Sequence, residues 1–194
     1  DRNFKILDFI HKTLNYFIKC EIIITADDGF LSWRTVLLPL CRKRKWQCIL
    51  FITTGLIDDK FSIDEKKQII GRSLCDKFLS KKDINKLIQE EYVSLGIHGH
   101  KHKSLRNGFQ EFKDDVNKAI EIGSLYGLDV KKYAIPYGRL KDISNEMMDY
   151  LSSVGVESIY LACGNQKVFP SCINRSILDL NKSYGILNLL GRVL

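Results

Sequence analysis

The sequence lacks any apolar run long enough to cross a membrane. One of the longest is Val36-Leu37-Leu38-Pro39-Leu40-Cys41, which is far below the ~20 residues that a membrane-spanning helix requires. We therefore expect no integral membrane segment within these 194 residues. Internal repeats, low-complexity tracts and linkers are also missing, so the 194 residues predict a single domain over positions 1–194. The first residue is Asp1 rather than Met, which leaves open a preceding segment or a removed signal.

Cysteine pairs with the spacing of metal or redox sites are also missing. There is no CxxC pair and no zinc-ribbon spacing. The six cysteines are Cys20, Cys41, Cys48, Cys75, Cys163 and Cys172. Several lie in apolar stretches typical of a protein core, which favours free thiols and a cytoplasmic, reducing compartment. Disulfides in an exported protein remain the alternative, because six is an even number and connectivity cannot be read from sequence.

Acidic residues are outnumbered by basic ones. The chain has 30 Lys and Arg against 23 Asp and Glu, a net charge of +7 that favours contact with anionic surfaces or substrates. The densest basic run, Arg42-Lys43-Arg44-Lys45, is more typical of a solvated helix end than of a phosphate-binding site. We therefore expect no nucleic-acid partner, and the composition indicates no oligomeric state.

Apolar runs and amphipathic stretches alternate along the chain. Buried strands are predicted at Glu21–Thr25, Gln47–Ile52, Val93–Ile97, Tyr133–Ile135 and Ser158–Leu161. Helices are predicted from Pro39, over Asp64–Ile70, over Asp83–Glu91 with Asp83 as N-cap, from Phe109 to Tyr126 and from Ile143 to Val154. Continuously apolar strands alternating with helices predict an α/β fold with a parallel sheet and outer helices. Periodicity leaves open whether the sheet closes into a barrel.

Polar residues follow three of the predicted strands. Asp27 and Asp28 come after the first strand, a histidine cluster follows the third, and Pro136-Tyr137-Gly138 follows the fourth. In parallel α/β folds, sites assemble at the edge where the carboxyl ends of the strands converge. This placement predicts that the polar residues form one functional site.

The histidine cluster holds three of the four histidines of the chain, at His98, His100 and His102. Two imidazoles and a carboxylate are a common ligand set for a catalytic divalent ion. On a straight strand His98 and His102 would be about 13 Å apart, so we expect the chain to turn within Gly99 to Lys101, and Gly99 favours such a turn. A polar loop without a metal is the simpler alternative, but three histidines opposite an Asp-Asp-Gly turn favour the metal site.

The same residues resemble a known family. Three segments look like the first three motifs, in order, of the polysaccharide deacetylases, also called the NodB-homology or carbohydrate esterase family four group. They are Thr25-Ala26-Asp27-Asp28-Gly29, His98-Gly99-His100-Lys101-His102 and Tyr133-Ala134-Ile135-Pro136-Tyr137-Gly138, within a resemblance that runs from about Ile22 to Ala162. The resemblance implies a distorted (β/α) barrel of the polysaccharide deacetylase type and metal-dependent removal of N- or O-acetyl groups from sugars.

The resemblance also implies a role for each motif residue. Asp27 would be the general base, and Asp28, His98 and His102 would bind the metal. Zinc is the expected ion, with cobalt or nickel as alternatives. The backbone N–H of Tyr137 would help to hold the oxyanion. An acetylated carbohydrate is the expected substrate.

The sequence departs from the family pattern at several positions. No histidine follows His102, whereas many members take the leaving-group proton from a late histidine. The position where many members have an arginine that orients the base is Ala134. Arg175 is the candidate replacement if it approaches from another strand, and Pro136, Tyr137 and Arg175 are the candidate substrate-binding residues.

Three functional hypotheses follow. The first is a metal-dependent hydrolase that acts on C–N bonds and removes acetyl groups from a carbohydrate in surface-polysaccharide or cell-envelope metabolism. The second is a catalytically weak, carbohydrate-binding relative of the deacetylases. The third is a metal hydrolase of amidohydrolase or metallo-β-lactamase type, since His98-Gly99-His100 is an HxH pattern. In the metallo-β-lactamase type an aspartate usually precedes the last histidine of the motif, and Lys101 stands at that position here. No downstream histidines complete a site of either type.

Overall fold

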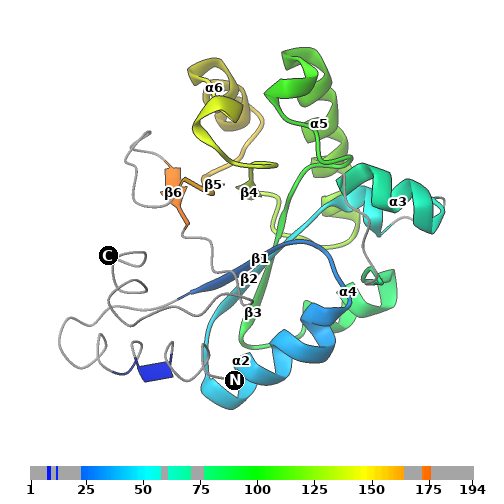
Figure 1. The fold of residues 1–194 in the computed structure, drawn as a ribbon, viewed down its shortest axis with the longest axis vertical. Helices are drawn as coiled ribbons and strands as arrows, with labels where there is room; N and C mark the ends of the chain where they lie inside the picture. The colour runs from blue at the N-terminus through cyan, green and yellow to red at the C-terminus, as the bar shows by residue number, and fades with distance from the viewer. Residues whose placement is uncertain are drawn as a thin grey trace.

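A computed structural model describes residues 8–9, 12, 23–57, 61–70, 77–163 and 172–175. Six parallel strands form one sheet in which their spatial order is their order in the chain (Figure 1). They are β1 (Ile24–Asp28), β2 (Cys48–Ile52), β3 (Val93–Ile97), β4 (Lys132–Ala134), β5 (Ser158–Leu161) and β6 (Cys172–Asn174). Successive strands are neighbours in a (β/α) barrel, whereas the strand order of a doubly wound sheet reverses at a switch point. The observed order is therefore that of a barrel. The sheet curls into a half-barrel, which confirms the expected distorted (β/α) barrel.

Helices surround the outer face of the curled sheet (Figure 1). They are α2 (Leu38–Arg44), which continues a π-helical turn at Trp33–Leu37, α3 (Ile63–Ile70), α4 (Lys81–Leu87), α5 (Phe109–Leu125) and α6 (Asn145–Ser153). Short 3₁₀ turns lie at Thr54–Leu56, Leu105–Asn107 and Leu140–Asp142. Among the described residues, no helix is both long and apolar enough to span a bilayer.

Both faces of the sheet are packed. In β2, Cys48, Leu50 and Ile52 belong to the large core cluster beneath the helices, whereas Ile49 and Phe51 form a second cluster with Ala134 and Tyr160. Because successive side chains of a strand point to opposite faces, the second cluster fills the concave side of the half-barrel. This double burial explains why the strands read as continuous apolar runs.

The predicted helices and most strands are confirmed, but the first strand is displaced. It was expected to end at Thr25, with Ala26 to Asp28 in a turn, and residues 21 and 22 lie outside the described residues. Instead β1 continues to Asp28, because β2 pairs with it from Ile24↔Cys48 to Asp28↔Ile52. Backbone pairing with a neighbouring strand therefore outweighs the low strand propensity of aspartate.

The predicted N-cap of α4 is wrong. The helix begins at Lys81, and Ser80 is the N-cap. Ser80 Oγ accepts a hydrogen bond from the Asp83 N–H at 3.3 Å, and Asp83 Oδ2 accepts one from the Ser80 N–H at 2.9 Å. Asp83 thus occupies the third helical position of a capping box, where an acid reaches back to the cap.

The cysteines of the described residues are free thiols. Cys41 and Cys48 are buried, and Cys163 and Cys172 are half-buried. The apolar packing expected for several of them is confirmed for Cys41 and Cys48, which belong to the core beneath the helices. Cys20 and Cys75 lie outside the described residues.

Candidate active site

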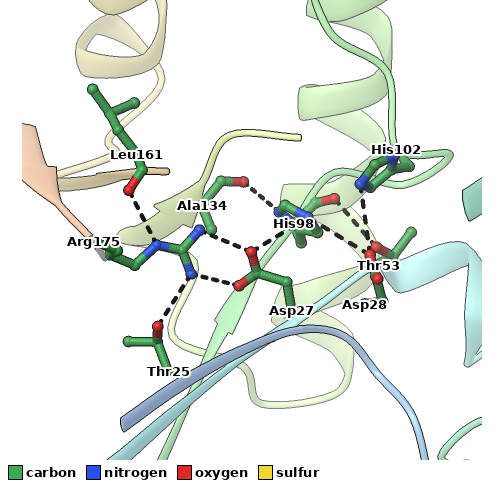
Figure 2. Close-up of polar contacts among 9 residues, drawn as sticks. All are labelled: Thr25, Asp27, Asp28, Thr53, His98, His102, Ala134, Leu161 and Arg175. Carbon is green, nitrogen blue, oxygen red and sulfur yellow. Dashed lines mark hydrogen bonds and ion pairs between the residues drawn. The ribbon is translucent and has the colours of Figure 1, made fainter. Parts of the chain in front are cut away.

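The three expected metal ligands meet at the carboxyl ends of the first and third strands. Asp28 ends β1, and His98 and His102 follow β3 (Figure 2). The Nε2 atoms of His98 and His102 lie 3.7 and 3.6 Å from Asp28 Oδ1. All three residues are buried, and one ligand atom from each lies within 4.8 Å of the others.

The ring of His98 has a fixed orientation. Its Nδ1 lies 2.7 Å from the carbonyl oxygen of Ala134 (Figure 2). Because a carbonyl oxygen only accepts, Nδ1 carries the proton and donates it, which leaves the lone pair of a neutral ring on Nε2. Nε2 faces the carboxylates of Asp28 and Asp27. A histidine that binds a metal through one ring nitrogen is commonly oriented by a hydrogen bond from its other ring nitrogen.

These residues fit a divalent cation. Two atoms bound to one tetrahedral Zn²⁺ at about 2.0–2.1 Å lie roughly 3.3 Å from each other. The separations of 3.6 and 3.7 Å between Asp28 and the two histidines are slightly larger than this. A small inward movement would therefore bring one carboxylate oxygen and two imidazole nitrogens onto the same ion.

The turn between the two histidines depends on Gly99 and on an acid from α5. Gly99 has φ +76°, and a Cβ on it would collide with Asp115 Oδ2. The buried Asp115 carboxylate accepts hydrogen bonds from the backbone N–H groups of His100 at 2.9 Å and Lys101 at 2.6 Å, with a longer one from Lys103. Burial raises the pKa of Asp115, although these N–H groups act in the opposite direction.

His100 is not one of the three residues of the Asp28–His98–His102 cluster. Its Nδ1 lies 3.0 Å from Thr54 Oγ1, and its carbonyl accepts from the Gly55 N–H at 2.9 Å. A Cβ on Gly55 would collide with that carbonyl oxygen. His100 therefore anchors the loop to the 3₁₀ turn after β2.

Backbone strain is concentrated in this site. Within the part of the chain that the structure describes, four non-glycine residues have positive φ: Asp28 (86°), Lys45 (55°), His102 (56°) and Tyr137 (63°). Lys45 ends α2, where a left-handed residue is common. The other three are predicted site residues, and strained backbone of this kind clusters at functional sites.

The predicted base pairs with the predicted arginine. Arg175 follows β6 and donates to both carboxylate oxygens of Asp27, at 2.6 and 2.8 Å (Figure 2). Burial acts to raise the pKa of Asp27, but the neighbouring imidazole of His98 and the charge and hydrogen bonds of Arg175 outweigh it, so the pKa lies below its ordinary value. Asp27 is thus held as a carboxylate 3.9 Å from His98 Nε2.

The third motif forms the opposite wall. Pro136 is buried, whereas Tyr137 is 38% exposed and its ring packs edge-on against His102, with centroids 4.7 Å apart. No described residue accepts a backbone hydrogen bond from the Tyr137 N–H. Its donor is therefore available to a group in the site.

Several residues at the site were not expected from the sequence. Asp115 carried a signal, because it lies beside Phe112 and Val116 on the apolar face of α5, where an acid is unusual. Arg106 and Asp142 carried none, because they bond to each other across 36 residues of sequence. Arg106 also lies over the Tyr137 ring.

Comparisons with known proteins agree with this geometry. A model of the polysaccharide deacetylase family matches residues 17–159. No curated protein matches the chain. Its fold is similar to three solved structures, each less than 20% identical. They are a de-N-acetylase from Aggregatibacter actinomycetemcomitans (TM-score 0.69, 12% identity, 95% of this chain and 85% of that chain), the deacetylase PplD of Streptococcus pyogenes in complex with acetate (0.67, 15%, 98% and 77%) and the BpsB deacetylase domain of Bordetella bronchiseptica (0.61, 17%, 80% and 70%).

The family match spans more than half of the chain and includes all three motifs, although it ends before Arg175. The structural similarity independently supports the fold. The chain belongs to the polysaccharide deacetylase family and is a carbohydrate deacetylase.

Proposed function

We propose that the protein is a metal-dependent deacetylase that removes N- or O-linked acetyl groups from a surface or cell-envelope polysaccharide. The observation that carries this proposal is the position of Asp27. Its carboxylate, paired with Arg175, lies beside the buried Asp28–His98–His102 cluster. A base next to a divalent-ion site is what hydrolysis of an acetyl group requires.

Asp28, His98 and His102 would hold the ion, with zinc as the first choice and cobalt or nickel as alternatives. An ion bound there would polarise the acetyl carbonyl and lower the pKa of water. The hydrogen bond from His98 Nδ1 to the Ala134 carbonyl supports this role, because it directs Nε2 toward the cluster.

Asp27 would move the proton. It accepts a proton from the attacking water, whose oxygen forms a bond to the acetyl carbon. When the bond from that carbon to the sugar nitrogen or oxygen breaks, Asp27 returns the proton to the leaving atom, and acetate is the other product. Arg175 positions Asp27 through two hydrogen bonds. Asp27 thus serves first as the base and then as the acid.

The Tyr137 N–H would stabilise the oxyanion formed between these two steps. A well-placed donor of this kind is worth about 10²–10³ in kcat. Tyr137 borders the cluster through its contact with His102. The acetate held by the structurally similar PplD deacetylase is the product that we expect from this chain.

A second candidate function is that of a carbohydrate-binding relative with little turnover. The sequence favours it at one point, because no histidine follows His102 to protonate the leaving group. If Asp27 cannot return its proton, the substrate would bind without being hydrolysed.

Acetate release from an acetylated amino-sugar oligomer tests both candidates. Metal-stripped protein would be assayed with and without Zn²⁺ or Co²⁺, alongside Asp27→Asn and, as a matched control, the exposed Asp114→Asn. We expect metal-dependent release that falls at least about 10²-fold in Asp27→Asn and persists in Asp114→Asn. Oligomer binding and metal binding without release on several substrates would support the second candidate and contradict the first.

A further inference from the structure

Backbone hydrogen bonds hold both flanks of the turn that carries the Tyr137 N–H. Gly138 accepts from the Ala162 N–H at 2.9 Å, and the Ile135 N–H donates to Tyr160 at 3.0 Å, so the flanks are tied to β5 and to the residue that follows it. Tyr137 itself has φ +63°. The left-handed conformation is unfavourable for an L-residue with a large side chain, so contacts of that side chain must help to maintain it.

The ring of Tyr137 makes two such contacts. It packs against the imidazole of His102, with a centroid distance of 4.7 Å and an interplanar angle of 73°. The guanidinium carbon of Arg106 lies 4.3 Å from the centroid of the same ring. Rotating the Tyr137 backbone out of the left-handed region would move the ring away from both neighbours.

Arg106 is itself fixed by a buried acid. Its Nη2 donates to Asp142 Oδ2 at 2.9 Å, and its Nε donates to the other oxygen. Asp142 is fully buried, whereas the Arg106 side chain is 38% exposed. The Arg139 N–H also donates to Asp142 Oδ2, at 3.3 Å. A planar guanidinium held in this bidentate way has little freedom to leave the tyrosine ring.

We propose that the Arg106–Asp142 pair is a positioning clamp that keeps Tyr137 in the left-handed conformation and so aims its backbone N–H at the oxyanion. Neither residue touches the reacting atoms. The clamp acts through the Tyr137 ring, and this role rests on the proposed deacetylase function. A salt bridge that served stability alone would affect folding without any dependence on the residue at position 137.

The test replaces both members of the pair, Arg106→Gln with Asp142→Asn. The double variant leaves no uncompensated buried charge, and its two amides can still bond, so the fold is expected to persist. The matched control is Lys131→Gln with Glu157→Gln. Lys131 and Glu157 are exposed and their charged atoms lie 2.7 Å apart. They directly precede β4 and β5, at the strand ends far from the candidate site.

We expect the kcat of the Arg106→Gln/Asp142→Asn variant to fall about tenfold. The variant loses the contact of the Arg106 guanidinium with the Tyr137 ring, whose energy is comparable to the cost of the left-handed conformation of Tyr137. KM and zinc affinity, measured by chelator competition, should remain the same. The Lys131→Gln/Glu157→Gln control should keep its kcat. In a Tyr137→Gly background the clamp substitutions should change kcat by less than about twofold, because glycine adopts positive φ without strain.

An equal loss of kcat in the Tyr137→Gly background would overturn the clamp, as would an unchanged kcat in the Tyr137 protein. The backbone chemical shifts of Tyr137, in protein with isotope-labelled tyrosine, provide a readout that does not need turnover. If the unmodified protein releases no acetate, the proposed function fails, yet the clamp still predicts a Tyr137 shift change in the double variant. Unchanged shifts would overturn it in that case too.

Discussion

Asp115 shows how one side chain on a helix shapes the candidate metal site. Its buried carboxylate accepts hydrogen bonds from the backbone N–H groups of His100, Lys101 and Lys103, all within the loop that carries the two candidate histidine ligands. These bonds require the loop to lie against α5, and only glycine at position 99 leaves room for the carboxylate. Asp115 therefore fixes the spacing of His98 and His102 without contacting an ion.

We predict that Asp115→Asn weakens zinc binding about tenfold, within the range typical of residues that support metal ligands. Asparagine keeps one acceptor oxygen but turns an amide N–H₂ group toward backbone donors, which disfavours the observed loop. The dissociation constant would be measured by competition with a chromophoric chelator. Asp114→Asn is the control, because Asp114 is exposed on the same helix and accepts from Gln110. Equal zinc affinity in all three proteins would contradict the role of Asp115.

Residues that follow strands could be found from the sequence, and residues that act through long-range partners could not. Asp28 and His98 were predicted together because parallel strands bring their carboxyl ends to one edge. Arg175 was named as a candidate partner of the base only through the family pattern. Its pairing depends on β6, which no periodicity predicted, since three residues are too few to show an alternation.

At the scale of secondary structure, strand register sets the level of the site. Asp28 pairs with Ile52, and Ile52 pairs with Ile97, so the next residues, Thr53 and His98, lie at the same edge as Asp28. The Thr53 N–H donates to the Asp28 carbonyl, and the His98 N–H donates to the Ile52 carbonyl. The sequence-based boundary of β1 missed this arrangement, because aspartate and glycine together usually indicate a turn.

The capping box of α4 predicts a pH-dependent contribution to stability. Burial acts to raise the pKa of Asp83, but hydrogen bonds with Ser80 and the charge of Arg34 outweigh it, so the pKa lies below its ordinary value. A lowered native pKa means that the contribution is fully present above about pH 4, the pKa in the unfolded chain, and is lost as the pH falls through the native pKa.

We therefore expect Asp83→Asn to lower the free energy of unfolding by about 1 kcal/mol at pH 7, with a smaller difference near pH 3. Urea unfolding at the two pH values measures this. Asp64→Asn is the control, since Asp64 lies in the first turn of α3 and is 88% exposed. It should change the free energy by a few tenths of a kcal/mol at most. A difference for Asp83→Asn that stays constant with pH would exclude the carboxylate as the cause.

At the scale of the whole molecule, the site joins parts of the sheet that are distant in the chain. Arg175, after the last described strand, bonds to Asp27 and Thr25 on the first, and its guanidinium lies over the Phe51 ring inside the half-barrel. The candidate metal ligands connect β1 to the loop after β3. Function and fold therefore share the same residues, and a ligand of the site should stabilise the entire half-barrel.

Zinc should raise the melting temperature of the protein. A ligand that binds only the native state at 100 times its Kd adds about 2.7 kcal/mol, which corresponds to roughly 5–10 °C for a chain of this size. His102→Asn is the matched variant, because asparagine tolerates the positive φ of this position but removes the imidazole. Calorimetry of the two stripped proteins, with and without zinc, should show the increase in the unmodified protein and little in the variant. An equal increase in both would mean that zinc binds elsewhere, since the loss of one of three ligands weakens the Asp28–His98–His102 site directly.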